Sequence, residues 1–349
     1  MTAFSYAARG LGDVLRRLDR VWATTALLFL GLVIAVPSQA GASFVFTLES
    51  FLWILPFLLI SVLLAAWLKA SGADQLVALA VSRKPLAAIL IATLAGAFSP
   101  FCSCGVVPVV ASLLAAGVPL SAVMAFWLSS PIMDPEMFVL MAAQLPFSFT
   151  LAKVAAALII GLLAGGAVLV LERMGYLSNP LRADFAACGT SCGGGGPSDV
   201  RRPRWRFWHQ AERRALFATE ARDVSLFLTK WLLLAFALES LMVAWLPGEL
   251  VAQTLGGEGW QAVPLAVAVG VPAYLNGYAA IPLIGELMDN GMAWGAALAF
   301  MVAGGVTSLP ASMAVYAVAR RAVFTWYLLI ALVGSLLIGF GYQALLVLS

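Results

Sequence analysis

Long apolar runs constrain the fold of this chain more than any other feature. Runs such as 46–68, 147–171 and 323–348 reach the roughly 18 to 20 residues that a helix needs to cross a bilayer. Only 11% of the 349 residues are charged, less than half the share of about 25% that is typical of soluble domains. The sequence therefore predicts an all-α polytopic membrane protein. The small formal charge of +3 gives no reason to expect a nucleic-acid partner.

The placement of basic residues predicts the topology. The segment "VSRKP" (81–85) carries Arg83 and Lys84, and the polar segment 172–223 holds nine arginines against six acidic residues. Short loops rich in Lys and Arg stay in the cytoplasm. If both segments are cytoplasmic, the residues between them must cross the membrane an even number of times. Three apolar blocks lie there, at 86–116, 119–145 and 147–171, so one of them should not cross.

The block at 86–116 is the one that should not cross, because Pro100 and Gly105 interrupt its centre. We expect a re-entrant helical hairpin with "PFCSCG" (100–105) at its tip. Irregular backbone at membrane depth is tolerated only inside protein or around a wet cavity, which makes this tip a candidate site. The next block is broken as well, at "SSPIMDPE" (129–136), where two prolines interrupt a helix.

The second half of the chain repeats this pattern. "PAYLNG" (272–277) resembles "PFCSCG" and, after a two-residue insertion, residues 282–300 match 108–126 in proline, glycine and phenylalanine positions. The break at 129–136 then corresponds to "AGGVTSLP" (303–310). Paired broken helices of this kind are typical of secondary transporters, whose binding site lies near the bilayer midplane.

Charges also predict that the two halves are inverted. The loop 247–261 has two acidic residues and no basic one, whereas Arg320 and Arg321 return to the cytoplasm. The predicted organisation is a basic segment with a first helix (1–45), repeat 1 (46–171), a cytoplasmic Arg/Gly-rich loop (172–223) and an inverted repeat 2 (224–349). The N-terminus and the loop should be cytoplasmic and the C-terminus periplasmic.

Cys102 and Cys104 are the strongest candidates for binding cargo. Thiolates are soft ligands for Cu(I), Zn(II) and other thiophilic centres such as trivalent arsenic. Two thiols one residue apart can converge on one ion only where the backbone bends, and two ligands leave an open, exchangeable site. Free cysteine can also be a small buried apolar residue. The remaining candidates lie at the tips and breaks: Pro100, Ser103, Gly105, Tyr274, Asn276, Thr307 and Ser308.

Acidic residues inside a bilayer are costly and tend to be functional. Asp134 and Glu136 follow the first break, and Glu239 lies in a spanning segment. They can couple transport to protons, or Asp134 and Glu136 can simply cap the second half-helix. We expect Lys153 and Lys230 to extend toward the membrane interface.

The remaining cysteines, Cys188 and Cys192, fall in the Gly-rich loop, where they are either an accessory metal-collecting pair or part of a linker. No P-loop pattern is present, so ATP hydrolysis by this chain is not expected. With the single histidine His209 and no triad, a hydrolase is not expected either. The sequence predicts a non-enzymatic protein without a cofactor.

The stretches "FCSCGVVPVVASLLAAG", "AFWLSSPIMDPEMF" and the second-half segment 270–310 resemble the bacterial permease family that contains YraQ and the ArsP-type organoarsenical efflux permeases. The resemblance implies an inner-membrane permease and, in the arsenical branch, export of trivalent organoarsenicals through thiols matching Cys102 and Cys104. Other members are proposed to handle copper or zinc, or to act with a small second subunit. Tyr274 and Asn276 stand in the second tip, without a third cysteine.

These observations favour a secondary permease that exports a thiophilic metal or metalloid species, with membrane lipids and a small accessory subunit as the expected partners. A membrane protein that cycles Cys102 and Cys104 between dithiol and disulfide, or handles sulfur species, is the first alternative. A subunit of a two-component permease complex is the second.

Overall fold

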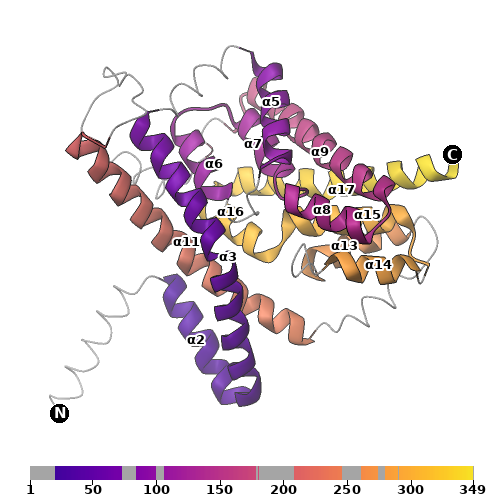
Figure 1. Ribbon diagram of the computed structural model, residues 1–349, viewed down its shortest axis with the longest axis horizontal. Coiled ribbons are helices and arrows are strands. Elements are labelled where there is room, and N and C mark those ends of the chain that lie inside the picture. Colours follow the sequence, from indigo (N-terminus) through magenta and orange to yellow (C-terminus); the bar gives the residue numbers. More distant parts are fainter. Residues whose placement is uncertain are drawn as a thin grey trace.

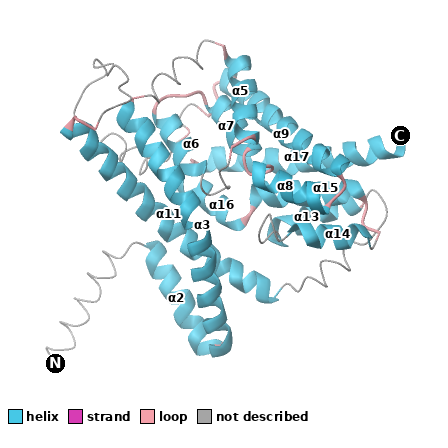
Figure 2. Ribbon diagram, viewed as in Figure 1, coloured by secondary structure: helices cyan, strands magenta, loops and turns pink. Residues whose placement is uncertain are grey.

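The computed structural model describes residues 20–72, 84–99, 106–177, 180, 208–245, 261–273, 280–289 and 291–348. Every regular element in these ranges is an α-helix (Figures 1 and 2), which confirms the predicted all-helical fold. The first half contains α2 (Arg20–Ala35), α3 (Pro37–Ser71), α5 (Pro85–Ala97), α6 (Val106–Ala115), α7 (Leu120–Ser129), α8 (Pro135–Gln144) and α9 (Phe147–Arg173). The second half contains α11 (Ala211–Trp245), α13 (Ala262–Ala273), α14 (Ala280–Asp289), α15 (Trp294–Thr307), α16 (Leu309–Val318) and α17 (Arg321–Leu348).

Three of these helices are long and apolar enough to cross a membrane by themselves: Phe147–Arg173, Ala211–Leu241 and Arg321–Leu348. Two bent pairs raise that number to as many as five: α3, which bends by 44° at Pro56, and α15 with α16, which meet at 42°. Apolar side chains remain exposed along the spanning helices, as contact with lipid tails requires; on α9 and α17 they include Leu151, Ile159, Leu162, Val170, Leu329, Val333 and Leu337. The chain is thus an integral membrane protein.

The predicted breaks are observed. α7 ends at Ser129 and α8 begins at Pro135, because the prolines of this stretch cannot donate the hydrogen bonds that would continue the helix. The apolar block before it forms two short helices, α5 with 13 residues and α6 with 10. At 1.5 Å per residue these reach roughly 20 and 15 Å, short of the hydrocarbon core of about 30 Å. Neither helix can cross alone, in agreement with the predicted hairpin.

Both long helices begin earlier than the predicted boundaries at 46 and 224. α3 begins at Pro37, since a proline at the first helical position has no N–H of its own that would need a partner, and α11 begins at Ala211. Residues 211–223, which the sequence assigns to the polar loop, are therefore the first turns of α11.

Polar contacts fix this end of α11 against α3. The Arg213 guanidinium donates to the carbonyls of Ala70 (3.1 Å) and Ser71 (3.0 Å), and the Lys69 ammonium lies 2.6 Å from a carboxylate oxygen of Glu220. Carbonyls at a helix C-terminus lack intrahelical partners, so an arginine there satisfies them. The charged residues at 211–223, whose composition resembles that of a loop, therefore connect α11 to the end of α3.

The two halves match helix by helix at one spacing. Pro37 and Ala211, which begin α3 and α11, lie 174 positions apart (211 minus 37). The same spacing separates the first residues of α6 and α14, α7 and α15, α8 and α16, and α9 and α17. Contacts between the halves are reciprocal, since α6 packs against α16 and α14 packs against α8. The inverted orientation of the halves stays a prediction from their loop charges.

The local geometry repeats at this spacing too. Gly117 and Gly291 both have positive φ, 87° and 95°, a conformation that glycine adopts without strain. Gly165 and Gly339 are also equivalent, since each faces the same two positions of its own half: Ile89 and Ala125 for the first, Val263 and Ala299 for the second. The two halves therefore share one packing scheme.

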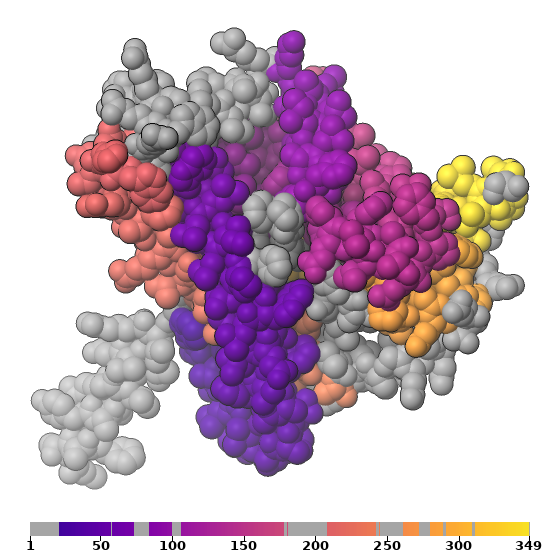
Figure 3. Space-filling view, in the orientation of Figure 1, coloured from indigo at the N-terminus to yellow at the C-terminus, as the bar shows by residue number. Residues whose placement is uncertain are grey.

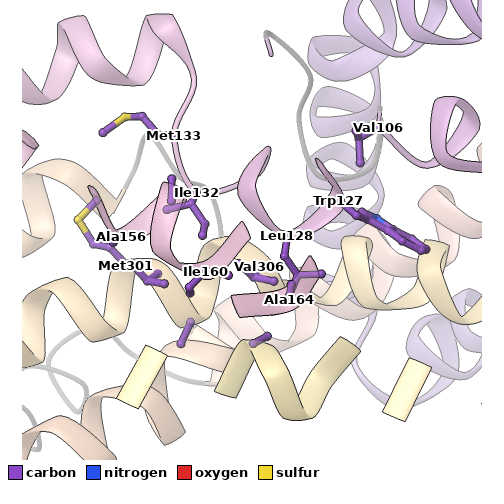
Figure 4. Close-up of a cluster of buried hydrophobic side chains, with 14 of the residues drawn as sticks. Val106, Trp127, Leu128, Ile132, Met133, Ala156, Ile160, Ala164, Met301 and Val306 are labelled. Atoms are coloured by element: carbon purple, nitrogen blue, oxygen red, sulfur yellow. The ribbon is translucent and has the colours of Figure 1, made fainter. Parts of the chain in front are cut away.

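A continuous apolar core joins the halves (Figure 4). It combines residues of α6, α7, α9 and the first break with Met301 and Val306 of α15. Trp127 and Tyr327 lie against one another in it, with ring centroids 5.6 Å apart. Because both halves supply this core, Ile132 and Met133 of the first break belong to the same apolar cluster as α15, the helix that leads to the second break.

Candidate functional site

The predicted cysteine tip lies outside the described residues, as do Tyr274 and Asn276 of the second tip and the loop pair Cys188 and Cys192. Pro100, Cys102, Ser103, Cys104 and Gly105 remain sequence predictions. What the structure describes is their surroundings. α6, which follows Gly105 directly, is almost completely buried from Val106 to Ser112.

The helices after the two tips pack on the broken spans of the opposite half. α6 contacts α3, α7 and α16, and α14 contacts α8 and α15. The space-filling view shows α8 (magenta) beside α14 (orange) on one face of the protein (Figure 3). The short helix after each tip therefore contacts the half-helix that follows the break in the other half: α6 contacts α16, and α14 contacts α8.

The spacing between equivalent packed residues of the two halves changes which residues of the two tips are expected to be equivalent. Gly96 and Gly270, which approach the backbones of Phe126 and Phe300, lie 174 positions apart, and so do Val106 and Ala280 at the starts of α6 and α14. The two-residue insertion assumed from the sequence is therefore not needed between these points. Carried through the tips, the spacing of 174 aligns Cys102 with Asn276 and Cys104 with Tyr278.

Asp134 caps α8, the simpler of its two predicted roles. Its Oδ1 accepts a hydrogen bond from the backbone N–H of Met137 at 2.7 Å, which satisfies one of the unpaired amides of the first turn. Glu136 is exposed in the same turn, where a carboxylate is favourable near the positive end of the helix dipole.

The second break is stabilised by hydroxyls. Thr307 Oγ1 donates to the carbonyl of Ala303 at 2.6 Å, and Ser312 Oγ donates to the carbonyl of Thr307 at 3.0 Å. Ser308 stands 174 positions after Asp134 and likewise precedes the second half-helix, but its side chain makes no capping hydrogen bond. Thr307 thus has a structural role, because its hydroxyl bonds a carbonyl in the last turn before the break; a role of Thr307 and Ser308 in binding stays a prediction.

Glu239 is buried in α11, with 5% of its surface exposed. Its Oε2 has no hydrogen-bond partner among the described residues. A carboxylate in such surroundings is costly unless it is protonated or paired during function. The candidate identified from sequence thus has the environment of a proton or cation acceptor.

Lys153 is the functional candidate that the sequence reasoning missed. It was expected to reach the interface, but that expectation was wrong: the side chain on α9 is fully buried. Its Nζ lies 3.1 Å from Met137 Sδ and 3.6 Å from Met141 Sδ. The available signal was its place well inside the apolar run 147–171, with Met137 and Met141 four residues apart on the preceding helix.

Comparisons with known proteins agree with this architecture. The model of the ArsP_1 family, described as "Predicted permease", matches residues 41–344. The UPF0718 protein YcgR of Bacillus subtilis (strain 168) is 37% identical over 81 residues, which are 23% of this chain and 28% of that relative. No solved structure matches the chain. Since the family model extends over most of the sequence, from α3 to α17, the chain belongs to this family of predicted permeases.

Proposed function

We propose that this permease is a secondary exporter of a thiophilic metal or metalloid species, such as a trivalent organoarsenical or a soft metal ion, in a bacterial inner membrane. The observation that carries the proposal is the reciprocal packing of α6 on α16 and of α14 on α8. The helix that follows each predicted tip packs against the half-helix that follows the break of the other half, which supports a transporter whose site lies between repeats. Membrane lipids and a small accessory subunit are the proposed partners.

Cys102 and Cys104 ligate the cargo in this proposal. Two thiolates bind a soft centre and leave it exchangeable, which export requires. We propose that the tip around the two cysteines is shaped by Pro100, Ser103 and Gly105. The second half would contribute Asn276, together with Tyr274 or Tyr278, to the same site. Cys188 and Cys192 serve as an accessory pair that delivers cargo from the cytoplasmic side.

The direct test is transport by everted membrane vesicles. We expect uptake of at least one of methylarsenite, Cu(I) or Zn(II), and we expect a proton gradient to change its rate. Thiosulfate, included in the same panel, tests the sulfur-handling alternative. A vesicle preparation that moves thiosulfate alone would contradict the proposed cargo class.

Neutral replacement of the break carboxylates is expected to abolish coupled transport without reducing expression. Asp134→Asn is the sharper variant, because asparagine caps helices about as well as aspartate and only the charge is lost. Glu136→Gln is the companion. Proton-dependent flux in vesicles is the measurement, with protein amount as the control. Unchanged pH-dependent flux in both variants would leave Asp134 and Glu136 as caps, and Glu239→Gln would then be expected to abolish coupling.

Topology follows from the charge pattern. Reporter fusions within 178–207 should show cytoplasmic activity, and fusions at the C-terminus should show periplasmic activity, because nine arginines lie between residues 172 and 223. A periplasmic signal from the central fusions would contradict both the re-entrant hairpin and the inverted repeat.

A further inference from the structure

Lys153 is an ammonium group inside the protein with weak partners. It is fully buried, and the hydrogen-bond acceptors at its Nζ are the thioethers of Met137 and Met141. Thioether sulfur is a weak acceptor, and a cation in apolar surroundings within a membrane is expensive. Such a group is retained for a reason other than packing.

Met137 and Met141 are the buried side chains of α8; its other residues are partly or fully exposed. Both of them end at Lys153 Nζ. α8 otherwise makes its main contacts with α9 and α14. The two buried side chains of this short helix thus meet the lysine, and its further contacts are with α14 and between Phe138 and Phe147. An element with so few buried side chains is one that can move.

Asp134 and Lys153 both contact Met137, in the first turn of α8. Asp134 Oδ1 receives the N–H of Met137, the residue whose sulfur touches the ammonium, and the two charged groups interact electrostatically. The carboxylate of the break and the ammonium of α9 therefore converge on the first turn of α8.

The equivalent position in the second half is also occupied by a buried polar side chain, but its interaction is a hydrogen bond of a neutral group. Tyr327 lies 174 positions after Lys153, is also buried, and donates its hydroxyl to the carbonyl of Val306 in the last turn before the second break. Position 153/327 thus holds the break in both halves. The second half uses a neutral hydrogen bond, whereas the first uses a charge, which can be exchanged for another partner.

We propose that Lys153 is a positioning residue of the permease, whose ammonium holds α8 and the preceding break in place through Asp134, Met137 and Met141, and that these contacts are released and remade in each transport cycle. This inference rests on the proposed transport function. It identifies α8 as the moving element and the second break as the fixed one.

Cysteine labelling in native membranes tests the inference without any cargo. Ser130→Cys places a thiol in the break, at a position that is 1% exposed, and the same protein without this change gives the background of the native cysteines. Adding Lys153→Met should increase the labelling of Cys-substituted Ser130 by a water-soluble maleimide at least about fivefold, because α8 loses its anchor. Adding Asp134→Asn, which keeps the cap, should act in the same direction.

Lys230→Met is the matched control. Lys230 lies on α11 over the ring of Phe227, 5.2 Å from its centroid, and its removal should leave the labelling unchanged. Tyr327→Phe should also leave it unchanged, since that hydroxyl holds the other break.

Transport separates positioning from binding. Lys153→Met should reduce export at least about tenfold. Methylarsenite should nevertheless still protect Cys102 and Cys104 from alkylation, because the cargo site remains. If the single variant does not fold, the double variant Lys153→Met with Asp134→Asn takes its place, because it removes both charges and leaves neither without its partner.

The inference would be overturned if Lys153→Met, or the double variant, left the labelling of Cys-substituted Ser130 at the rate measured with Lys153 and Asp134 intact. Failure of the proposed function is seen separately, as absence of cargo protection and transport in the unmodified protein while the labelling differences persist.

Discussion

Replacing either Cys102 or Cys104 with serine is expected to abolish transport, with a loss of at least about a hundredfold in rate. A hydroxyl is a hard and weakly coordinating group, so a soft cargo loses one of its two proposed ligands. Serine is nearly isosteric with cysteine, and we therefore expect expression and detergent-solubilised size to stay normal. Vesicle transport and cellular resistance are the measurements. Normal transport by the double serine variant would show that the two residues only fill space.

Redox state distinguishes cargo binding from thiol–disulfide cycling, since both predict the same loss on mutation. A ligating pair must stay reduced, so diamide should block transport by forming the disulfide. A redox pair should instead show thiol and disulfide forms whose proportion shifts with turnover on alkylation gels. We expect the reduced form throughout, with protection of both thiols by cargo.

Gly96→Ala is expected to cause a large loss of stability. A Cβ there would lie 2.1 Å from Ser129 Oγ and 2.7 Å from the carbonyl oxygen of Phe126. The serine side chain can rotate but the carbonyl cannot, so α5 must move away from α7, at a cost on the order of 3 kcal/mol. A large fall in the apparent melting temperature in detergent, or loss of folded protein, is the expected result.

Gly166→Ala is the matched control, because nothing lies within 4 Å of a Cβ at that position of α9. It should leave stability unchanged or slightly raised, since alanine favours helix over glycine. Gly270→Ala should have an intermediate effect, with contacts of 3.0 to 3.3 Å at Phe300. Equal stability of the Gly96 and Gly166 variants would contradict the packing of α5 on α7.

The sequence alone determined the helical class, the ends of α9 and α17 to within a few residues, and the break between α7 and α8. These features depend on local signals: a continuous apolar run defines a spanning helix, and Pro131 and Pro135 cannot take part in a continuous one. Asp134 also had a local signal, since an acidic residue just before a helix is a typical cap. Its capping role was one of the two predicted.

The tertiary structure decided what depends on contacts between distant segments. The start of α11 was placed too late because a polar, arginine-rich composition resembles a loop until Arg213 and Glu220 are seen against the end of α3. The start of α3 was placed too late because residues 37–45 are mostly small or polar and lie before the long apolar run. The sequence comparison placed a two-residue insertion at the tips, whereas the packed glycines Gly96 and Gly270 and the starts of α6 and α14 are all 174 positions apart. The register of the tip residues themselves stays a prediction.

Lys153 is the clearest case of a residue whose type was visible in the sequence but whose surroundings were decided by the tertiary structure. In the sequence it is one lysine in an apolar helix, and whether its long side chain reaches the interface or turns inward depends on which helix lies beside it. Only the packing of α8 against α9 brings Met137 and Met141 to its ammonium and Asp134 to the same turn. The residue types that can do chemistry were visible in the sequence; their partners were decided by the fold, because burial is a property of the assembled helices.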